Sequence, residues 1–155
     1  MIVDPVLAAG GGGALSEAGF ALQLAEQLIP LSTLTTPNSD ELARLCPDLD
    51  QAAAATKLLE SGCHAVLVTG THIESDDVVN TLYREGQQPL STRWPRLSGE
   101  YHGSGCTLTS HIAGLFARTG DLDQAVLQAQ QYTWDCLSRA DQLGQGQLIP
   151  NRIAT

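Results

Sequence analysis

The sequence predicts an α/β fold in which a mainly parallel sheet lies between helices on both faces, a three-layer sandwich. Short β-type runs alternate with helical patterns along the chain, an order that implies parallel strands joined by right-handed crossovers. The run Ala65–Thr69 (AVLVT) is apolar throughout, as expected for a strand covered on both faces. Of the 155 residues, 43% are hydrophobic and 16% are charged, so we expect one core and a single domain over residues 1–155.

The amino-terminal elements are expected to be a short strand, a loop and a helix. Ile2-Val3 forms the strand, and Pro5 ends it because proline cannot donate to the ladder. Gly10–Gly13 must be a loop, since four consecutive glycines cost a helix or strand too much conformational entropy. Ser16 can cap the helix that follows, and Pro30 ends that helix.

A second strand and two helices precede the apolar strand at Ala65–Thr69. The second strand is expected over Leu31–Thr36. Asn38 is a good N-cap for a short helix through Leu45, because acidic residues follow it in the first turn. A longer helix over about Leu49–Glu60 ends before a glycine, the usual residue after a helix carboxyl end.

A hairpin and two helices complete the predicted elements. Residues 78–83 and 88–94 flank a glycine-containing turn and predict a β-hairpin at one edge of the sheet. A helix is expected over residues 103–118, and Asp121 or Asp123 caps the last helix. The apolar stripe of that last helix has a period of 3.6 residues and consists of Leu122, Val126, Ala129, Thr133, Cys136, Leu137 and Ala140.

Charge and cysteine content narrow the classes of function. A formal charge of −9 argues against binding to nucleic acid or to an anionic membrane, but it does not exclude a small phosphorylated substrate. No apolar run approaches the roughly 20 residues that span a bilayer, and the amino terminus lacks the basic start of a signal peptide. The four cysteines include no CxxC pair, so we expect reduced thiols in a cytoplasmic protein without zinc.

Polar motifs follow each of the first three predicted strands. Asp4 follows the first strand, Asn38 and Glu41 follow the second, and Gly70 and His72 follow the third. In parallel sheets ligands bind beyond the carboxyl ends of the strands. This convergence predicts a binding site at that edge of the sheet.

The motif Gly103-Ser104-Gly105-Cys106 stands at the start of a predicted helix. Small residues there let consecutive N–H groups face outward and add to the positive end of the helix dipole, which makes an anion hole for a phosphoryl group. Cys106 lies in the first turn, where a thiolate is favoured. An ordinary loop-to-helix junction and a small packed cysteine explain the same residues.

Asn38 and Glu41 also have two interpretations. Two oxygen ligands three residues apart at a helix start suit a hard cation or its water shell. The same residues form an ordinary capping box, with asparagine at the N-cap and glutamate at N3, and that interpretation needs no metal.

Taken together, DPVL at 4–7, LTTPNSDEL at 34–42, AVLVTGTH at 65–72 and HGSGCTL at 102–108 resemble hydroxymethylpyrimidine/phosphomethylpyrimidine kinases of the ribokinase-like superfamily. The cysteine at 106 is typical of the pyrimidine kinases. The resemblance implies ATP and Mg²⁺ as co-substrates. It also implies phosphoryl transfer to the hydroxymethyl group, and then to the phosphate, of 4-amino-5-hydroxymethyl-2-methylpyrimidine.

The resemblance assigns roles by position. The anion hole and the candidate base would be Gly103, Ser104, Gly105 and Cys106; the nucleotide side would be Asp4, Thr69, Gly70 and His72; Asn38 and Glu41 would organise Mg²⁺ and its waters. Relatives often carry lysine where this chain has Thr69, and a polar pair where it has Gly10-Gly11. Both differences remove groups that would help to hold phosphate.

Chains of this family begin with further βα units, so the sequence resembles the carboxyl-terminal, nucleotide-side part of such an enzyme. We therefore expect Val3, Val66 and Val68 to lie on strands that lack neighbours, and self-association or a separate amino-terminal chain to cover them. The alternatives are a non-catalytic nucleotide-binding or interaction module of the same fold, and another ribokinase-like kinase that acts on pyridoxal.

Overall fold

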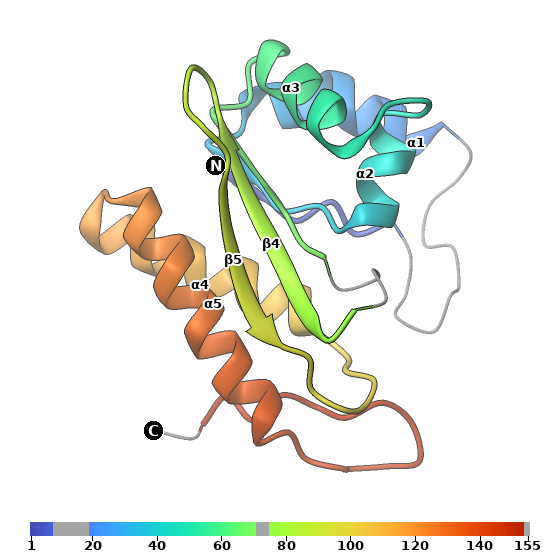
Figure 1. The fold of residues 1–155 in the computed structure, drawn as a ribbon, viewed down its shortest axis with the longest axis vertical. Coiled ribbons are helices and arrows are strands. Elements are labelled where there is room, and N and C mark those ends of the chain that lie inside the picture. The colour runs from blue at the N-terminus through green and yellow to red at the C-terminus, as the bar shows by residue number, and fades with distance from the viewer. Residues whose placement is uncertain (8–18, 71–74, 154–155) are drawn as a thin grey trace. The chain divides into compact units, whose positions relative to one another are not determined.

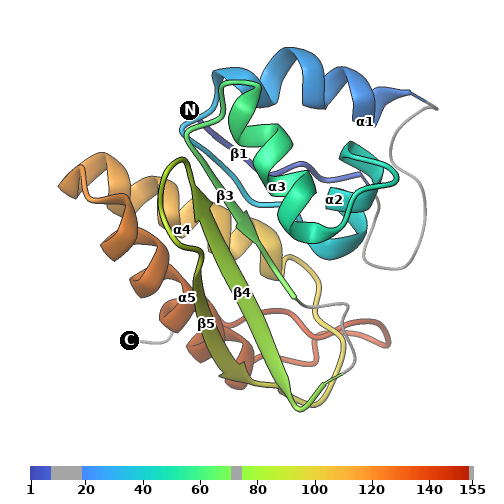
Figure 2. The same ribbon diagram turned by 45° about the horizontal axis from the view of Figure 1, so that its top comes forward.

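A mixed sheet, five-stranded in the described residues, organises the first part of the chain. The computed structural model describes residues 1–7, 19–70 and 75–153, which divide into two units, Met1–Arg96 and Leu97–Thr155. The strands of the first unit lie in chain order: β1 (Ile2–Val3), β2 (Leu34–Thr35), β3 (Ala65–Val68), β4 (Asp77–Arg84) and β5 (Leu90–Pro95) (Figures 1 and 2). β1, β2 and β3 pair in parallel, whereas β4 and β5 form an antiparallel hairpin against β3. The α/β fold and its edge hairpin are confirmed.

Helices cover one face of the parallel strands in this unit (Figure 2). α1 (Phe20–Gln23) continues into a π-helical stretch (Leu24–Leu28) and a 3₁₀ turn (Ile29–Leu31), and α2 (Ser39–Leu45) and α3 (Gln51–Glu60) follow β2. The predicted N-cap Ser16 and the Gly10–Gly13 loop lie outside the described residues.

The second strand is shorter than predicted. Leu31, expected within it, belongs to the 3₁₀ turn and is 71% exposed. Pro30 lacks the N–H that would continue the helix, and Ser32 closes the turn instead: its N–H and its Oγ–H both donate to the Ile29 carbonyl, at 2.9 and 2.6 Å. The paired strand therefore begins only at Leu34.

The start of α3 also differs from the prediction by two residues. Asp50 is the N-cap, and its Oδ1 accepts a hydrogen bond from the Ala53 N–H at 2.8 Å. Leu49 therefore lies before the helix and is 40% exposed. The helix ends at Glu60, as predicted.

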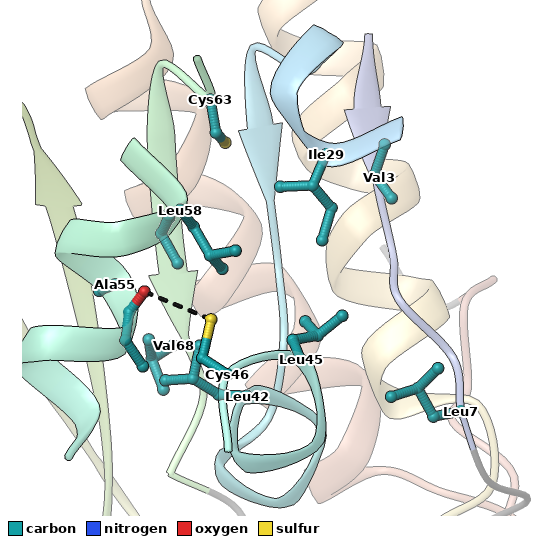
Figure 3. Packing of buried hydrophobic residues seen from close by; sticks show 12 residues of the cluster. Val3, Leu7, Ile29, Leu42, Leu45, Cys46, Ala55, Leu58, Cys63 and Val68 are labelled. Carbon is teal, nitrogen blue, oxygen red and sulfur yellow. Dashed lines mark hydrogen bonds between the residues drawn. The ribbon is translucent and has the colours of Figure 1, made fainter. Parts of the chain in front are cut away.

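The core of the first unit lies between the sheet and α2 and α3 (Figure 3). Val3, Val66 and Val68 are 7%, 0% and 1% exposed and share one cluster with Leu42 of α2 and Leu58 of α3. The expectation that these valines lack cover is wrong, because helices of the same unit pack on their face of the sheet. Because the three valines are buried within the unit, they give no reason to expect self-association.

The second unit contains two long helices that lie side by side, α4 (Ser104–Thr119) and α5 (Leu122–Ser138) (Figure 1). Gly120, with φ of 69°, ends α4, and Asp121 caps α5 by accepting from the Gln124 N–H at 3.0 Å. Asp121, and not Asp123, is therefore the cap. Ala140 of the predicted stripe lies beyond α5, whereas Ala125 and Gln130, absent from the prediction, are buried.

The segments that flank these helices pair with each other. The His102 N–H donates to the Leu148 carbonyl at 2.9 Å, and the Leu148 N–H donates to the Glu100 carbonyl at 2.8 Å. The carboxyl-terminal residues thus lie beside the segment that enters α4. The four cysteines, all of them described, form no disulfide, and no helix in the described ranges has the length and apolarity that a membrane crossing requires.

Candidate functional site

The segments that leave β2 and β3 run side by side, as the sequence predicts for the carboxyl ends of parallel strands. Asn38 and Thr69 form a parallel bridge, and the Thr69 N–H donates to the Pro37 carbonyl at 3.0 Å. Asp4 follows β1 and is half-buried, next to Val3, whose carbonyl accepts from the Thr36 N–H at 3.1 Å. His72 lies outside the described residues. The candidate residues at 4, 38 and 69 therefore stand at the ends of three neighbouring strands.

Gly70 makes a close approach to β4 that only glycine permits. A Cβ at this position would lie 2.3 Å from the Val79 carbonyl oxygen. The Gly70 N–H donates to Oδ1 of Asn80 at 3.2 Å, and Asn80 is 7% exposed. The sequence analysis did not identify Asn80; the available signal was a polar amide next to two apolar valines in the VVNTL run of the predicted hairpin. Asn80 holds the start of the segment that follows β3.

Asn38 and Glu41 form a complete capping box at the start of α2. The Glu41 N–H donates to Asn38 Oδ1 and the Asn38 N–H donates to Glu41 Oε2, each at 2.9 Å. This geometry confirms the capping interpretation. The Glu41 carboxylate also places a negative charge at this helix start, which favours a nearby cation. Among the described residues no group of three or more His, Cys, Asp or Glu side chains could hold a metal, so a cation here would need nucleotide and water ligands as well.

The Gly103–Cys106 motif opens α4, as predicted. Gly103 is the N-cap and has φ of 80°, in the left-handed region that favours glycine. Its carbonyl accepts from the Thr107 N–H at 3.0 Å and from Thr107 Oγ1 at 2.7 Å. The first turn, Ser104–Thr107, contains no acidic residue, and Cys106 is exposed. The amino end of α4 therefore presents positive potential and a thiol to the surroundings.

An aromatic pair joins α4 to α5 behind this helix start. The rings of His111 and Tyr132 stack with centroids 3.9 Å apart and planes 8° from parallel. The Tyr132 hydroxyl donates to the backbone carbonyl of Arg152 at 2.9 Å. Burial, and to a smaller extent the positive charge of Arg118, lower the pKa of His111 below its ordinary 6.5. His102 is exposed.

This lowered pKa predicts a pH-dependent stability. In the unfolded chain His111 titrates near its ordinary pKa of 6.5, so between the folded pKa and 6.5 the unfolded chain binds more protons. The contribution of neutral His111 is therefore complete above about 6.5 and is lost as the pH falls through that window. The free energy of unfolding is measured in urea at a series of pH values. As the pH falls below 6.5, we expect it to decrease less steeply in His111→Gln than in the wild type. The exposed His64→Gln is the control, and an unchanged slope in His111→Gln would contradict the assignment.

Comparison with known proteins identifies the family. The family model described as phosphomethylpyrimidine kinase matches residues 1–151. Hydroxymethylpyrimidine/phosphomethylpyrimidine kinases of Rhizobium meliloti and Mycobacterium tuberculosis (H37Rv) are 33% and 37% identical over 153 residues each, 94% of this chain. The chain spans only 57% and 55% of the lengths of these two relatives.

A solved structure confirms the fold. Pyridoxal kinase from Staphylococcus aureus in complex with AMP-PCP superposes with a TM-score of 0.85 at 22% sequence identity, covering 97% of this chain and 57% of that one. This likeness establishes the ribokinase-like fold. The family match extends over nearly the whole sequence, and the motif on which the resemblance depends lies at the start of α4. The chain therefore belongs to the phosphomethylpyrimidine kinase family.

Proposed function

We propose that this protein provides the nucleotide-side part of an enzyme that transfers the γ-phosphoryl group of ATP to 4-amino-5-hydroxymethyl-2-methylpyrimidine and to its phosphate. The observation that carries the proposal is the family match over residues 1–151 together with the Gly-Ser-Gly-Cys start of α4. Relatives over 30% identical bear the name hydroxymethylpyrimidine/phosphomethylpyrimidine kinase, which supports the choice of acceptor.

The amino end of α4 would bind the phosphoryl group during transfer. The bond from the γ-phosphorus to the bridging oxygen of ATP breaks, a bond from phosphorus to the acceptor oxygen forms, and ADP leaves. The N–H groups of Ser104, Gly105 and Cys106, with the helix dipole behind them, would stabilise the charge on the phosphoryl oxygens. In its thiolate form the Cys106 side chain, which is exposed in the first turn, would accept the proton of the acceptor hydroxyl.

The segments after β1, β2 and β3 would form the nucleotide side. The proposed nucleotide contacts are Asp4, Thr69, Gly70 and His72. Because glycine has no Cβ, the backbone at residue 70 can lie close to β4. Asn38 and Glu41 would hold Mg²⁺ through its water shell, and the ion would neutralise the β- and γ-phosphate oxygens.

An assay of the full chain tests the proposal. The protein is incubated with ATP, MgCl₂ and either the pyrimidine alcohol or its phosphate, and the products are separated by ion-exchange chromatography. Phosphorylated pyrimidine supports the proposed function. Nucleotide binding without turnover would support a non-catalytic module, and a higher kcat/KM with pyridoxal would support a pyridoxal-type kinase. Turnover that depends steeply on protein concentration would indicate that a second copy completes the site, whereas activity only with an added amino-terminal chain would indicate a divided enzyme.

Glu41→Gln is expected to raise the Mg²⁺ concentration required for half-maximal activity several-fold. Glutamine can still accept the Asn38 N–H bond of the capping box, so folding should persist, but the negative charge that favours the cation is lost. Magnesium titrations of the wild type and the variant measure the shift. Glu85→Gln, on the exposed hairpin turn, removes the same charge elsewhere and should leave the titration unchanged. Loss of stability with an unchanged Mg²⁺ requirement would show that Glu41 acts only as a cap.

A further inference from the structure

The guanidinium of Arg152 lies at the amino end of α4, although the two are far apart in the sequence. Its Nε donates to Thr107 Oγ1 at 2.9 Å, and its Nη2 donates to the Gly103 carbonyl at 3.4 Å. The same carbonyl accepts the first hydrogen bonds of the helix. Arg152 therefore stands against the same turn whose N–H groups form the proposed anion hole.

Both the backbone and the side chain of Arg152 are held, although the residue is exposed. Its carbonyl accepts from the Tyr132 hydroxyl at 2.9 Å, and the N–H of the preceding Asn151 donates to the Cys136 carbonyl at 3.0 Å. An exposed arginine ordinarily keeps its rotamer freedom, and fixing it has an entropic cost. Here contacts from both α4 and α5 oppose that freedom.

The electrostatics of this position favour a negatively charged ligand. The start of a helix is positive, so a cation beside it is unfavourable unless an anion is present. Both hydrogen-bond acceptors of the guanidinium, Thr107 Oγ1 and the Gly103 carbonyl, are neutral, and the first turn carries no acidic residue. A guanidinium has further N–H donors in a planar arrangement that matches two oxygens of a phosphoryl group. The helix end and Arg152 therefore add their positive potentials at one place.

Gly103 makes this approach possible. A Cβ on residue 103 would lie 2.9 Å from Arg152 Nη2, closer than a side-chain carbon and nitrogen normally come. Glycine at this N-cap thus meets two requirements, the left-handed backbone conformation and the space that the guanidinium occupies.

We propose that Arg152 binds the phosphoryl group at the start of α4 together with the first-turn N–H groups, and that Tyr132 positions it. The ligand is a phosphate or phosphoryl dianion. That this anion is a group in transfer between ATP and an acceptor rests on the proposed function, whereas the Arg152-dependent affinity for phosphate does not.

Phosphate binding by the full chain tests the proposal directly. Inorganic phosphate is titrated into the wild type, Arg152→Gln, Arg152→Lys and Arg118→Gln, with binding followed by calorimetry. We expect Arg152→Gln to raise the Kd about tenfold, as for loss of one charge-assisted contact, and Arg152→Lys to raise it less. The difference between wild type and Arg152→Gln should shrink as NaCl is added. Arg118→Gln removes the same charge from the last turn of α4 and should bind like the wild type.

Tyr132→Phe tests the positioning role. It removes the hydroxyl that holds the Arg152 backbone but keeps the ring that stacks on His111, so we expect a smaller rise in the Kd for phosphate and little change in stability. Wild-type affinity in Arg152→Gln, or no phosphate binding by the wild type, would overturn the assignment of Arg152. Wild-type affinity in Tyr132→Phe would overturn that of Tyr132. Arg152-dependent phosphate binding without any turnover of the pyrimidines would refute the proposed function and leave this inference in place.

Discussion

Replacing Gly70 with alanine is expected to lower the free energy of unfolding by about 3 kcal/mol or more, a large share of the stability of a typical domain. The added Cβ would lie 2.3 Å from the Val79 carbonyl oxygen and 3.2 Å from both the carbonyl carbon and the nitrogen of Val79. These are backbone atoms, so no side-chain rotation relieves the contact. β4 cannot move aside easily either, because it is paired with β3 on one side and with β5 on the other.

Urea unfolding of the purified full chain measures the loss. Gly114→Ala is the matched control: this glycine lies within α4, and beyond the neighbouring backbone of α4 itself no heavy atom of the described residues lies within 4 Å of a Cβ built on it. Alanine there should leave stability unchanged or raise it by up to about 1 kcal/mol, since glycine is the poorer helix former. If both variants unfolded at the wild-type midpoint, the close approach of Gly70 to β4 would be refuted.

Replacing Cys106 with aspartate is expected to reduce kcat/KM for the phosphorylated pyrimidine at least tenfold more than for the alcohol. Cys106 is exposed in the first turn of α4, where the acceptor would meet the phosphoryl group. A cysteine can be neutral near pH 7 and act as a base only in its thiolate form, whereas a carboxylate there is charged throughout and would repel an acceptor that already carries phosphate. The backbone N–H groups remain in the variant, so residual activity with the alcohol is expected.

Cys106→Ala should show the opposite preference. A phosphate acceptor is largely ionised and needs little help from a base, whereas a hydroxymethyl group must lose its proton. We therefore expect the larger loss with the alcohol. Steady-state kinetics with both acceptors measure the ratio, and Gln128→Glu, on the exposed face of α5, controls for an added negative charge elsewhere. Equal losses with both acceptors in Cys106→Ala, or no loss, would show that the thiol is only a helix-start residue.

The features that the sequence by itself determined are those formed by residues close together in the chain. The capping box joins Asn38 to Glu41 within one turn, and its residue types predicted it as one of two interpretations. Asp121 caps α5 within three residues and was one of two predicted caps, beside Asp123. The sequence also predicted that the small residues from Gly103 open α4, whereas the left-handed conformation of Gly103 was found only in the structure. Because these hydrogen bonds close over three or four residues, they depend little on the rest of the fold.

Only the tertiary structure decided the features that join distant segments. The sequence led us to expect that Val3, Val66 and Val68 would lack cover, but packing against α2 and α3 buries them. The β2 strand is short because the turn before it is closed by the hydrogen bond from Ser32 to the Ile29 carbonyl. The strands that pair with β2 are β1 and β3, which are far from it in the sequence.

The same reason explains the site residues that the sequence did not reveal. Asn80 holds Gly70 across the β3–β4 pairing, and Arg152 reaches Gly103 and Thr107 only because the carboxyl-terminal segment lies beside the entry to α4. An asparagine within a strand, or an arginine near the end of a chain, has no periodicity or spacing that reports its partner. These contacts are specified by packing and register, which become visible only once the distant segments are brought together.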